Sequence, residues 1–143
     1  LQPRPRSVYE MRTHLEKQGF TDAVIEKTVE GLQQNDLLND RRFTESWVLD
    51  RQTRNSGPRK IAYELGAKGV DRELVQSVIE QLGDSHSVRE LARQKLERLA
   101  EPDPKRAYRR LSQFLTRRGF EPDAVNETCR ELLREKYGPE GLS

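Results

Sequence analysis

The sequence is poor in the residues that build a thick apolar core. Hydrophobic residues occupy 33% of its 143 positions and aromatic residues 6%, whereas 35% are charged. Such a composition favours thin helical units that each bury one face against a neighbour, rather than one large core. No apolar run is long enough for a signal peptide or a membrane span, so we expect no membrane association and a cytoplasmic location.

Cysteine and histidine are nearly absent, which argues against most catalytic and metal-binding chemistry. The single cysteine, Cys129, excludes an internal disulfide framework and suits a reducing compartment. It falls on an apolar helical stripe, so we interpret it as a small buried hydrophobe and not as a nucleophile. His14 and His86 are interpreted as ordinary surface or loop residues. Since no glycine-rich phosphate loop occurs either, we expect a protein that is not an enzyme and has no cofactor.

Charge is nearly balanced overall but unevenly distributed along the chain. The net charge of +2 argues against a uniformly basic nucleic-acid-binding protein. Segments 41–60 and 101–120 each carry six basic and two acidic residues, a net charge of +4, whereas segment 121–143 carries −3. The two basic segments could contact an acidic partner or DNA phosphates, or they could be solvated helix surfaces paired with nearby acids such as Glu45 and Asp50. The candidate contacts are Arg41, Arg42, Arg51, Arg54, Arg59, Lys60, Lys68, Arg109, Arg110, Arg117 and Arg118.

The central stretch, residues 34–69, has the signals of a helix, a break and a second helix. Asp40 is expected to cap the first helix by accepting hydrogen bonds from its free amides. Gly57-Pro58 then stops this helix, and the proline is well placed to start the next one. Gly69 supplies the left-handed residue at the end of the second helix. The residues expected on the buried faces are Phe43, Trp47, Ile61 and Leu65.

The chain contains an internal repeat, marked by Gly19, Gly69 and Gly119 at intervals of 50 residues. An apolar frame recurs around these glycines in the same register, with residues that include Met11, Ile61 and Leu111, then Leu15, Leu65 and Leu115, then Phe20, Val70 and Phe120. The pattern predicts a helix that ends at the glycine, a turn with an apolar residue packed under it, and a second helix.

Each full repeat is predicted to begin with a further helix, at about 40–53 in the second repeat and 87–99 in the third. We therefore expect an all-α fold of three tandem three-helix repeats. Their expected bounds are 1–38, 39–84 and 85–136, followed by a flexible tail at 137–143 and fraying after Leu133. The first repeat lacks most of its opening helix. A single irregular helical bundle is the alternative, but it would not predict the equal spacing.

A specific residue pattern runs through the same repeats. It consists of Leu37–Phe43 (LLNDRRF), Arg51, Gly57–Leu65 (GPRKIAYEL), Lys68–Val70, Pro5–Ser7 (PRS) and Arg117–Phe120 (RRGF). This pattern resembles the signature of the RecX family, the regulatory proteins of the RecA recombinase. The resemblance covers essentially the whole chain, although the third repeat matches mainly by its glycine, aromatic and apolar frame, and the family's N-terminal extension is missing.

The resemblance implies a regulator that has no catalytic activity. RecX proteins form an elongated, curved array of three repeats that lies in the helical groove of the RecA–DNA filament. They depress its ATPase, strand-exchange and co-protease activities. The resemblance therefore implies a monomer whose partner is the RecA filament, with at most weak affinity for single- or double-stranded DNA. The competing hypothesis is a stand-alone DNA-binding repeat protein, which the two basic segments would support.

Overall fold

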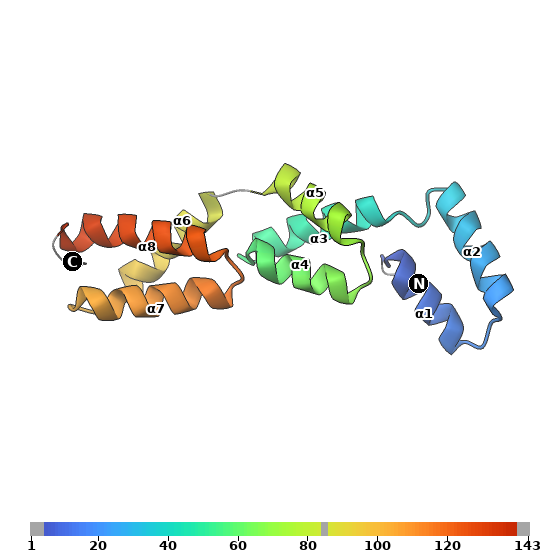
Figure 1. Cartoon of the computed structure of the whole chain (residues 1–143), viewed down its shortest axis with the longest axis horizontal. Coiled ribbons are helices and arrows are strands. Elements are labelled where there is room, and N and C mark those ends of the chain that lie inside the picture. Colours follow the sequence, from blue (N-terminus) through green and yellow to red (C-terminus); the bar gives the residue numbers. More distant parts are fainter. Residues whose placement is uncertain (1–4, 84–85, 140–143) are drawn as a thin grey trace. The chain divides into compact units, whose positions relative to one another are not determined.

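The computed structural model describes residues 5–83 and 86–139, and these residues form eight α-helices and no strand (Figure 1). The helices are α1 (Val8–Lys17), α2 (Asp22–Gln34), α3 (Asp40–Thr53), α4 (Pro58–Ala67), α5 (Arg72–Leu82), α6 (His86–Arg98), α7 (Pro104–Arg117) and α8 (Pro122–Tyr137). The all-α prediction is thus confirmed. The repeat bounds and the curved shape of the array stay predictions, and residues 1–4 and 140–143 lie outside the described part.

Helix starts and stops follow the local chemistry of the sequence. Ser7 and Glu10 form a capping box at the start of α1, in which each residue's side chain accepts from the other's main-chain N–H. Pro58 is the first residue of α4, as expected. Gly69 and Gly119 have φ values of 74° and 94°, which confirms the prediction of left-handed residues after α4 and α7.

Asp40 does not cap α3, so that prediction was wrong. Asn39 takes the capping role, because its side-chain oxygen accepts from the N–H of Arg42 at 3.0 Å. Asp40 is instead the first helical residue of α3, and its carboxylate accepts from the N–H of Val8 at 2.8 Å. Its role is to connect α3 to the first turn of α1.

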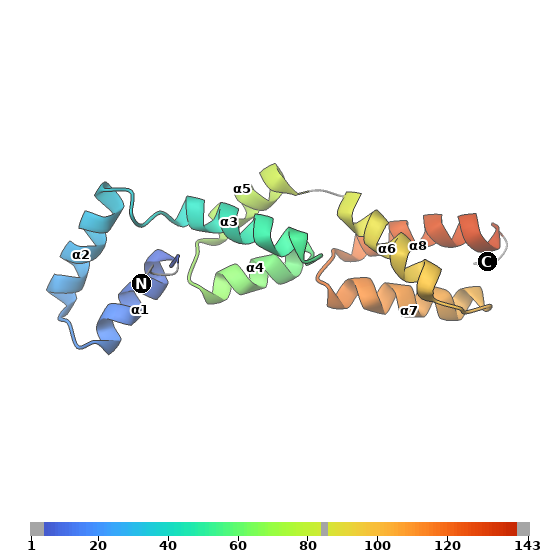
Figure 2. The same cartoon turned by 180° about the vertical axis from the view of Figure 1, so that it is seen from behind.

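By its internal contacts the chain divides into two compact units, and the described part of the first comprises residues 5–49 and 62–82. Its core includes a cluster of Ile25, Val29 and Leu38, against which Val8, Met11, Leu15 and Leu32 pack. The helices α1 and α2 form a hairpin, seen from two sides in Figures 1 and 2. Phe20 was expected to pack under the turn of this hairpin, but its side chain is 47% exposed.

The second unit comprises residues 50–61 together with the described residues from Gly83 onward. In it, α6, α7 and α8 pack together around one core, with α7 and α8 side by side in both views (Figures 1 and 2). The side chains buried there are Val88, Leu91, Ala92, Leu96, Ala107, Leu111, Leu115, Phe120, Val125, Cys129, Leu132 and Leu133. Burial of this apolar face is the main force that holds the three helices together.

The expectation of fraying after Leu133 was wrong for the next four residues. Helix α8 continues through Tyr137. The ammonium of Lys136 lies 3.4 Å from the carbonyl oxygens of Leu96 and Leu99, and the hydroxyl of Tyr137 donates to the carbonyl oxygen of Glu101. These bonds tie the last turn of α8 to the end of α6 and to the segment that connects α6 and α7.

Candidate partner-binding surface

Each unit contains the same kind of contact, in which the first turn of one helix lies on the glycine turn that ends another. In the first junction, residues 7–10 lie on Lys68-Gly69. In the second junction, residues 57–60 lie on Arg118-Gly119. Every position of the second junction follows its counterpart in the first by 50 residues. The repeat that was predicted from the glycines therefore also sets the register of these contacts.

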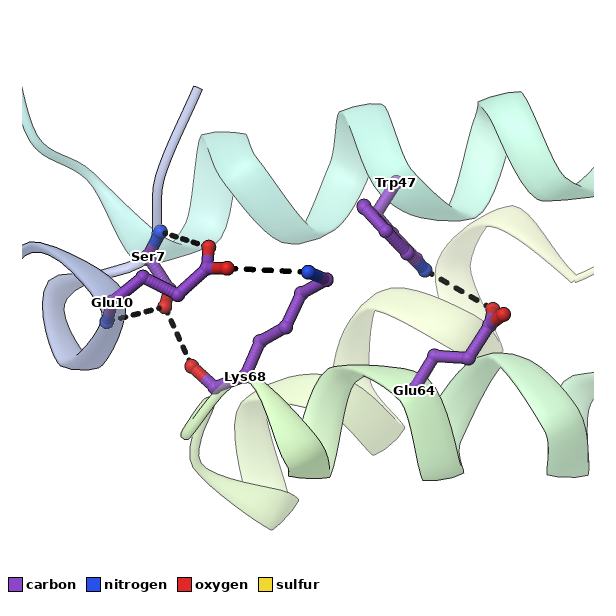
Figure 3. A network of polar contacts seen from close by, with 5 residues as sticks. All are labelled: Ser7, Glu10, Trp47, Glu64 and Lys68. Carbon is purple, nitrogen blue, oxygen red and sulfur yellow. Dashed lines mark hydrogen bonds and ion pairs between the residues drawn. The ribbon is translucent and has the colours of Figure 1, made fainter. Parts of the chain in front are cut away.

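The first junction is held by a hydrogen bond and an ion pair (Figure 3). The buried hydroxyl of Ser7 donates to the carbonyl oxygen of Lys68 at 2.5 Å. The carboxylate of Glu10 lies 3.2 Å from the Lys68 ammonium. A Cβ atom on Gly69 would overlap the side chain of Tyr9. Gly69 is therefore required both for its positive φ and for the close approach of α1.

Lys68, a predicted partner contact, lies inside this network. Its ammonium is 4.6 Å from the centre of the Trp47 ring, and the side chain is only 22% exposed. The indole N–H of Trp47 donates to Glu64 at 3.3 Å (Figure 3), while its ring stacks on Phe43 at 5.9 Å. These contacts support the prediction that Trp47 packs on the inner face of its helix.

The second junction is held by main-chain hydrogen bonds. The N–H of Gly57 donates to the carbonyl oxygen of Arg118 at 2.6 Å, and the N–H of Arg59 donates to that of Gly119 at 2.8 Å. The Arg118 guanidinium also approaches the carbonyl oxygen of Arg54 at 3.4 Å. A Cβ atom on Gly119 would overlap Lys60. The two basic segments, 41–60 and 101–120, thus meet at this junction.

The two junctions differ in charge. Where the first pairs Glu10 with Lys68, the second has Lys60 and Arg118 at the corresponding positions. We define the basic junction surface as Arg54, Arg59, Lys60, Arg117 and Arg118. Main-chain contacts bring positions 59–60 and 118–119 together, and a local excess of cations favours a bound anion. Sequence reasoning missed this cluster. Aligning the repeats at their 50-residue interval would have shown that Lys60 replaces the acidic Glu10, while Arg118 keeps the positive charge of Lys68.

Three members of the basic junction surface are available for a partner. Arg59, Lys60 and Arg117 are exposed and make no ion pair within the part of the chain that the structure describes. Arg54 is exposed but lies 3.5 Å from the carboxylate of Asp50. An exposed pair of this kind contributes little to stability, so Arg54 can exchange Asp50 for another anion.

Arg118, a predicted partner contact, has a half-buried side chain, with the guanidinium 5.1 Å from the centre of the Phe114 ring. The ammonium of Lys95 lies over the same ring at 4.9 Å. Phe114 thus orients two cations in the second unit. Of the remaining candidates on α7, Arg110 lies 3.7 Å from Glu101, and Arg109 is exposed without an ion pair among the described residues.

The candidates on α3 are each paired with an acid. Arg41 lies 3.9 Å from Glu45. Arg42 lies 2.7 Å from Asp36, and hydrogen bonds from Asn39 and Arg42, together with the charge of Arg42, lower the pKa of Asp36. Arg51 is half-buried, 3.6 Å from Asp50. The cations of α3 therefore fit the alternative interpretation, a solvated helix surface whose arginines pair with nearby acids of the same chain.

The rest of the described chain offers little further chemistry. Burial raises the pKa of the Cys129 thiol to about 12, which suppresses the nucleophilic thiolate and supports its interpretation as a packing residue. No three His, Cys, Asp or Glu side chains between residues 5 and 83 or 86 and 139 are grouped to hold a metal. In the same ranges no helix is long and apolar enough to cross a bilayer.

Helical repeats joined by such junctions define an α-helical repeat protein. Sequence profiles of one family match all three predicted repeats. They are "RecX, first three-helix domain" at residues 1–32, "RecX, second three-helix domain" at 39–79 and "RecX, third three-helix domain" at 86–129. The chain therefore belongs to the RecX family, which is a family of regulatory proteins and not of enzymes.

Individual relatives agree with the profiles. The regulatory protein RecX of Chlorobium phaeobacteroides (strain BS1) is 33% identical over 132 residues, which cover 92% of this chain and 87% of the relative. RecX of Amycolatopsis mediterranei (strain U-32) is 34% identical over 141 residues, covering 96% and 80%. The crystal structure of RecX from Lactobacillus salivarius matches with a TM-score of 0.82 at 23% identity, covering 90% of this chain and 86% of that chain. The last comparison shows a shared fold.

Proposed function

We propose that this protein regulates a RecA recombinase by binding in the groove of the RecA–DNA filament. In this proposal it depresses the ATPase, strand-exchange and co-protease activities of the filament. Membership of a family of regulatory proteins supports a regulatory role, and the resemblance of the sequence pattern supports RecA as the partner. A surface spread over several helical repeats suits contact with a long groove.

The observation that carries the proposal is the like-charged pair at the second junction. Lys60 and Arg118 stand where the first junction has the ion pair between Glu10 and Lys68. Neither Lys60 nor Arg118 makes an ion pair within the described residues, so an anion from a partner would stabilise this pair of cations. In a nucleoprotein filament the anion is a carboxylate of a recombinase subunit or a phosphate of the DNA.

A stand-alone DNA-binding protein is the second candidate function. It is favoured by the meeting of the two +4 segments at one junction. The net charge of −3 on residues 121–143 opposes a continuous DNA-binding surface. The two functions differ in salt dependence, because binding through several phosphates weakens steeply as salt is raised.

The test measures the DNA-dependent ATPase activity of RecA at increasing concentrations of this protein. A parallel titration measures the binding of this protein to DNA in the absence of RecA. Inhibition at substoichiometric protein, with weak DNA binding, is the expected result. Lys60→Glu should weaken inhibition at least tenfold, because it places an acid among the cations of the basic junction surface. Arg130→Glu is the matched control, because this exposed residue of α8 is not part of that surface.

Two outcomes would contradict the proposal. If saturating amounts of this protein leave the ATPase activity of RecA unchanged, the proposal that it regulates RecA is wrong. Inhibition that appears only when the DNA itself is saturated would favour the stand-alone DNA-binding function.

We also propose that the protein acts as a monomer in the cytoplasm, with repeats at 1–38, 39–84 and 85–136. The single cysteine, buried in the third repeat, is consistent with a reducing compartment. Sedimentation equilibrium at several concentrations tests the monomer directly, with a rising mass as the contradicting result.

A further inference from the structure

Lys95 of α6 occupies in the second unit the place that Trp47 of α3 occupies in the first. The two helices share one pattern of buried residues, which is Phe43, Thr44 and Val48 in α3 and Leu91, Ala92 and Leu96 in α6. In this register Lys95 is the counterpart of Trp47, and both side chains are half-buried. A cation thus stands where the first unit has an aromatic ring.

The side chains around the basic residue before the junction glycine differ accordingly. This residue is Lys68 in the first junction and Arg118 in the second. The side chains near Lys68 are Glu10, Trp47 and Glu64 (Figure 3). Their counterparts at the second junction are Lys60, Lys95 and Phe114. With the basic residue included, the formal charge is −1 in the first set and +3 in the second.

Phe114 brings two of the cations of the second set to one place. The ammonium of Lys95 lies 4.9 Å and the guanidinium of Arg118 lies 5.1 Å from the centre of its ring. Neither cation makes an ion pair among the described residues. One N–H of Arg118 is directed at the carbonyl oxygen of Arg54 at 3.4 Å, which leaves the other donors of the guanidinium for an anion.

The first junction shows which anion suits this arrangement. There the basic residue is paired with a glutamate, because the carboxylate of Glu10 lies 3.2 Å from the ammonium of Lys68. In the second junction the main chain of residues 57–60 lies on the glycine turn as residues 7–10 do in the first. The main-chain part of the junction is therefore complete, and the acidic side chain is the part that has no counterpart.

A single carboxylate also suits this unit better than a DNA backbone. Residues 121–143 carry a net charge of −3, and α8, which lies within them, packs against α7. This acidic segment opposes a run of phosphates more strongly than one acidic side chain, because each further phosphate adds to the repulsion.

We propose that Lys60, Lys95 and Arg118 form a carboxylate site that takes an aspartate or glutamate side chain of a partner protein. The bound carboxylate has the role at Arg118 that Glu10 has at Lys68, and Phe114 holds two of the cations beside it. The site rests on the function proposed above and deepens it, because it assigns the second junction to an acidic side chain of the recombinase and not to DNA.

The probe for the test is a synthetic peptide of alternating glutamate and alanine, blocked at both ends. It is added to the isotopically labelled full chain, and amide chemical shifts are followed by NMR. Saturable shifts at Lys60, Arg118 and Gly119 are the expected result. The same peptide with glutamine in place of glutamate is the control and should leave these amides unchanged, because it keeps the shape and lacks the charge.

Lys95→Gln is the variant that tests the cations beside Phe114. It should weaken binding of the glutamate peptide about tenfold, because one charge-assisted contact is lost. Lys105→Gln, at an exposed position in the first turn of α7, is the matched control and should bind the peptide as the unchanged chain does. Lys60→Glu should abolish binding, because it supplies the carboxylate from within the chain. Circular dichroism should show the same helix content in all three variants.

Four results would overturn the carboxylate site. The first is the absence of saturable shifts at millimolar glutamate peptide, and the second is equal binding of the glutamine peptide. The third is equal binding of the glutamate peptide by the Lys95→Gln variant. The fourth is tighter binding of a single-stranded oligothymidylate with the same number of negative charges, because it would assign these cations to phosphate.

The carboxylate site and the regulation of RecA can fail separately. If the glutamate peptide binds as expected but the ATPase activity of RecA is unchanged, the site stands and its partner is a different protein. If the protein inhibits RecA but the peptide does not bind and Lys95→Gln inhibits equally, the carboxylate site is wrong and the regulation stands.

Discussion

Lys60 occupies at the second junction the position that Glu10 occupies at the first. Glu10 makes an ion pair with Lys68 at 3.2 Å, whereas Lys60 is placed beside the turn that carries Arg118. The first junction is thus closed by an ion pair of its own, whereas Lys60 and Arg118 make no ion pair among the described residues.

Reversing the charge of Lys60 should stabilise the protein. Lys60→Glu gives the second junction the charge arrangement of the first, with an acid at position 60 and a base at position 118. Because both ends of such a pair are partly solvated, we expect a gain of about 0.5 kcal/mol in the free energy of unfolding. Urea denaturation at low salt measures it, and the gain should shrink in 1 M salt.

Glu10→Lys is the mirror experiment at the first junction. It sets two ammonium groups against each other at a site where the Glu10 side chain is 15% exposed. It also removes half of the capping box of α1. We expect a loss of about 2 kcal/mol. A stability equal to that of the unchanged chain would show that the ion pair is incidental to the junction.

Gly69 and Gly66 should respond oppositely to the same substitution. Gly69→Ala places alanine at a positive φ, and its Cβ atom would overlap the side chain of Tyr9. We therefore expect the free energy of unfolding to fall by at least about 2 kcal/mol. Gly66 lies inside α4 with open space around it. Gly66→Ala should therefore gain about 0.5–1 kcal/mol from helix propensity alone. Thermal unfolding followed by circular dichroism compares the two, and losses of equal size would contradict the junction geometry. Gly69→Val should disrupt the fold still more.

Replacing Thr44 by valine should stabilise α3. Thr44 is fully buried, and its hydroxyl has no hydrogen-bond partner in the described part of the chain. Valine has nearly the same shape without the desolvated polar group, so Thr44→Val should gain about 1 kcal/mol. Chemical denaturation measures the change. Thr44→Ser, which keeps the hydroxyl and removes a methyl group, is the control and should lose stability.

Cys129 should react slowly with alkylating reagents in the native protein. Its pKa rises from 9.0 to about 12 through burial, so the thiolate is scarce at pH 8 and the sulfur is also inaccessible. Iodoacetamide labelling followed by mass spectrometry should be at least tenfold slower than in urea. Labelling at equal rates in both conditions would contradict the buried site.

The same shift predicts a loss of stability in strongly alkaline solution. Because the folded-state pKa lies above the unfolded value, the folded state binds the thiol proton more tightly. The contribution of this thiol to the free energy of unfolding is therefore fully present below pH 9 and is lost as the pH rises from 9 to 12. Cys129→Ala should lack this part of the alkaline dependence.

Periodic features of the fold could be predicted from the sequence. The glycines at 19, 69 and 119 fixed the turns, because a positive φ selects glycine strongly. The buried residues of α4 and α7 followed from helical spacing, with Leu65, Leu111 and Leu115 fully buried as expected. These inferences need only local backbone chemistry and one-dimensional spacing.

Tertiary contacts could not be predicted in the same way. Lys68 was grouped with the surface cations because spacing does not show that Glu10 and Trp47 lie beside it. Arg118 was grouped with the same cations, because its packing on Phe114 depends on the orientation of both side chains. Asp40 and Asn39 are both good capping residues, so composition could not decide between them. The grouping of the candidate residues depends on these contacts, so the sequence could name candidates but could not predict how they are grouped.

The second junction is joined through main-chain amides and carbonyl groups, with the N–H groups of Gly57 and Arg59 as the donors. Every amino acid except proline has an amide N–H. Positions 59 and 60 can therefore change side chain while the hydrogen bonds that hold the junction persist. A protein built in this way can acquire a new preference among partners through surface substitutions, with little loss of folding stability.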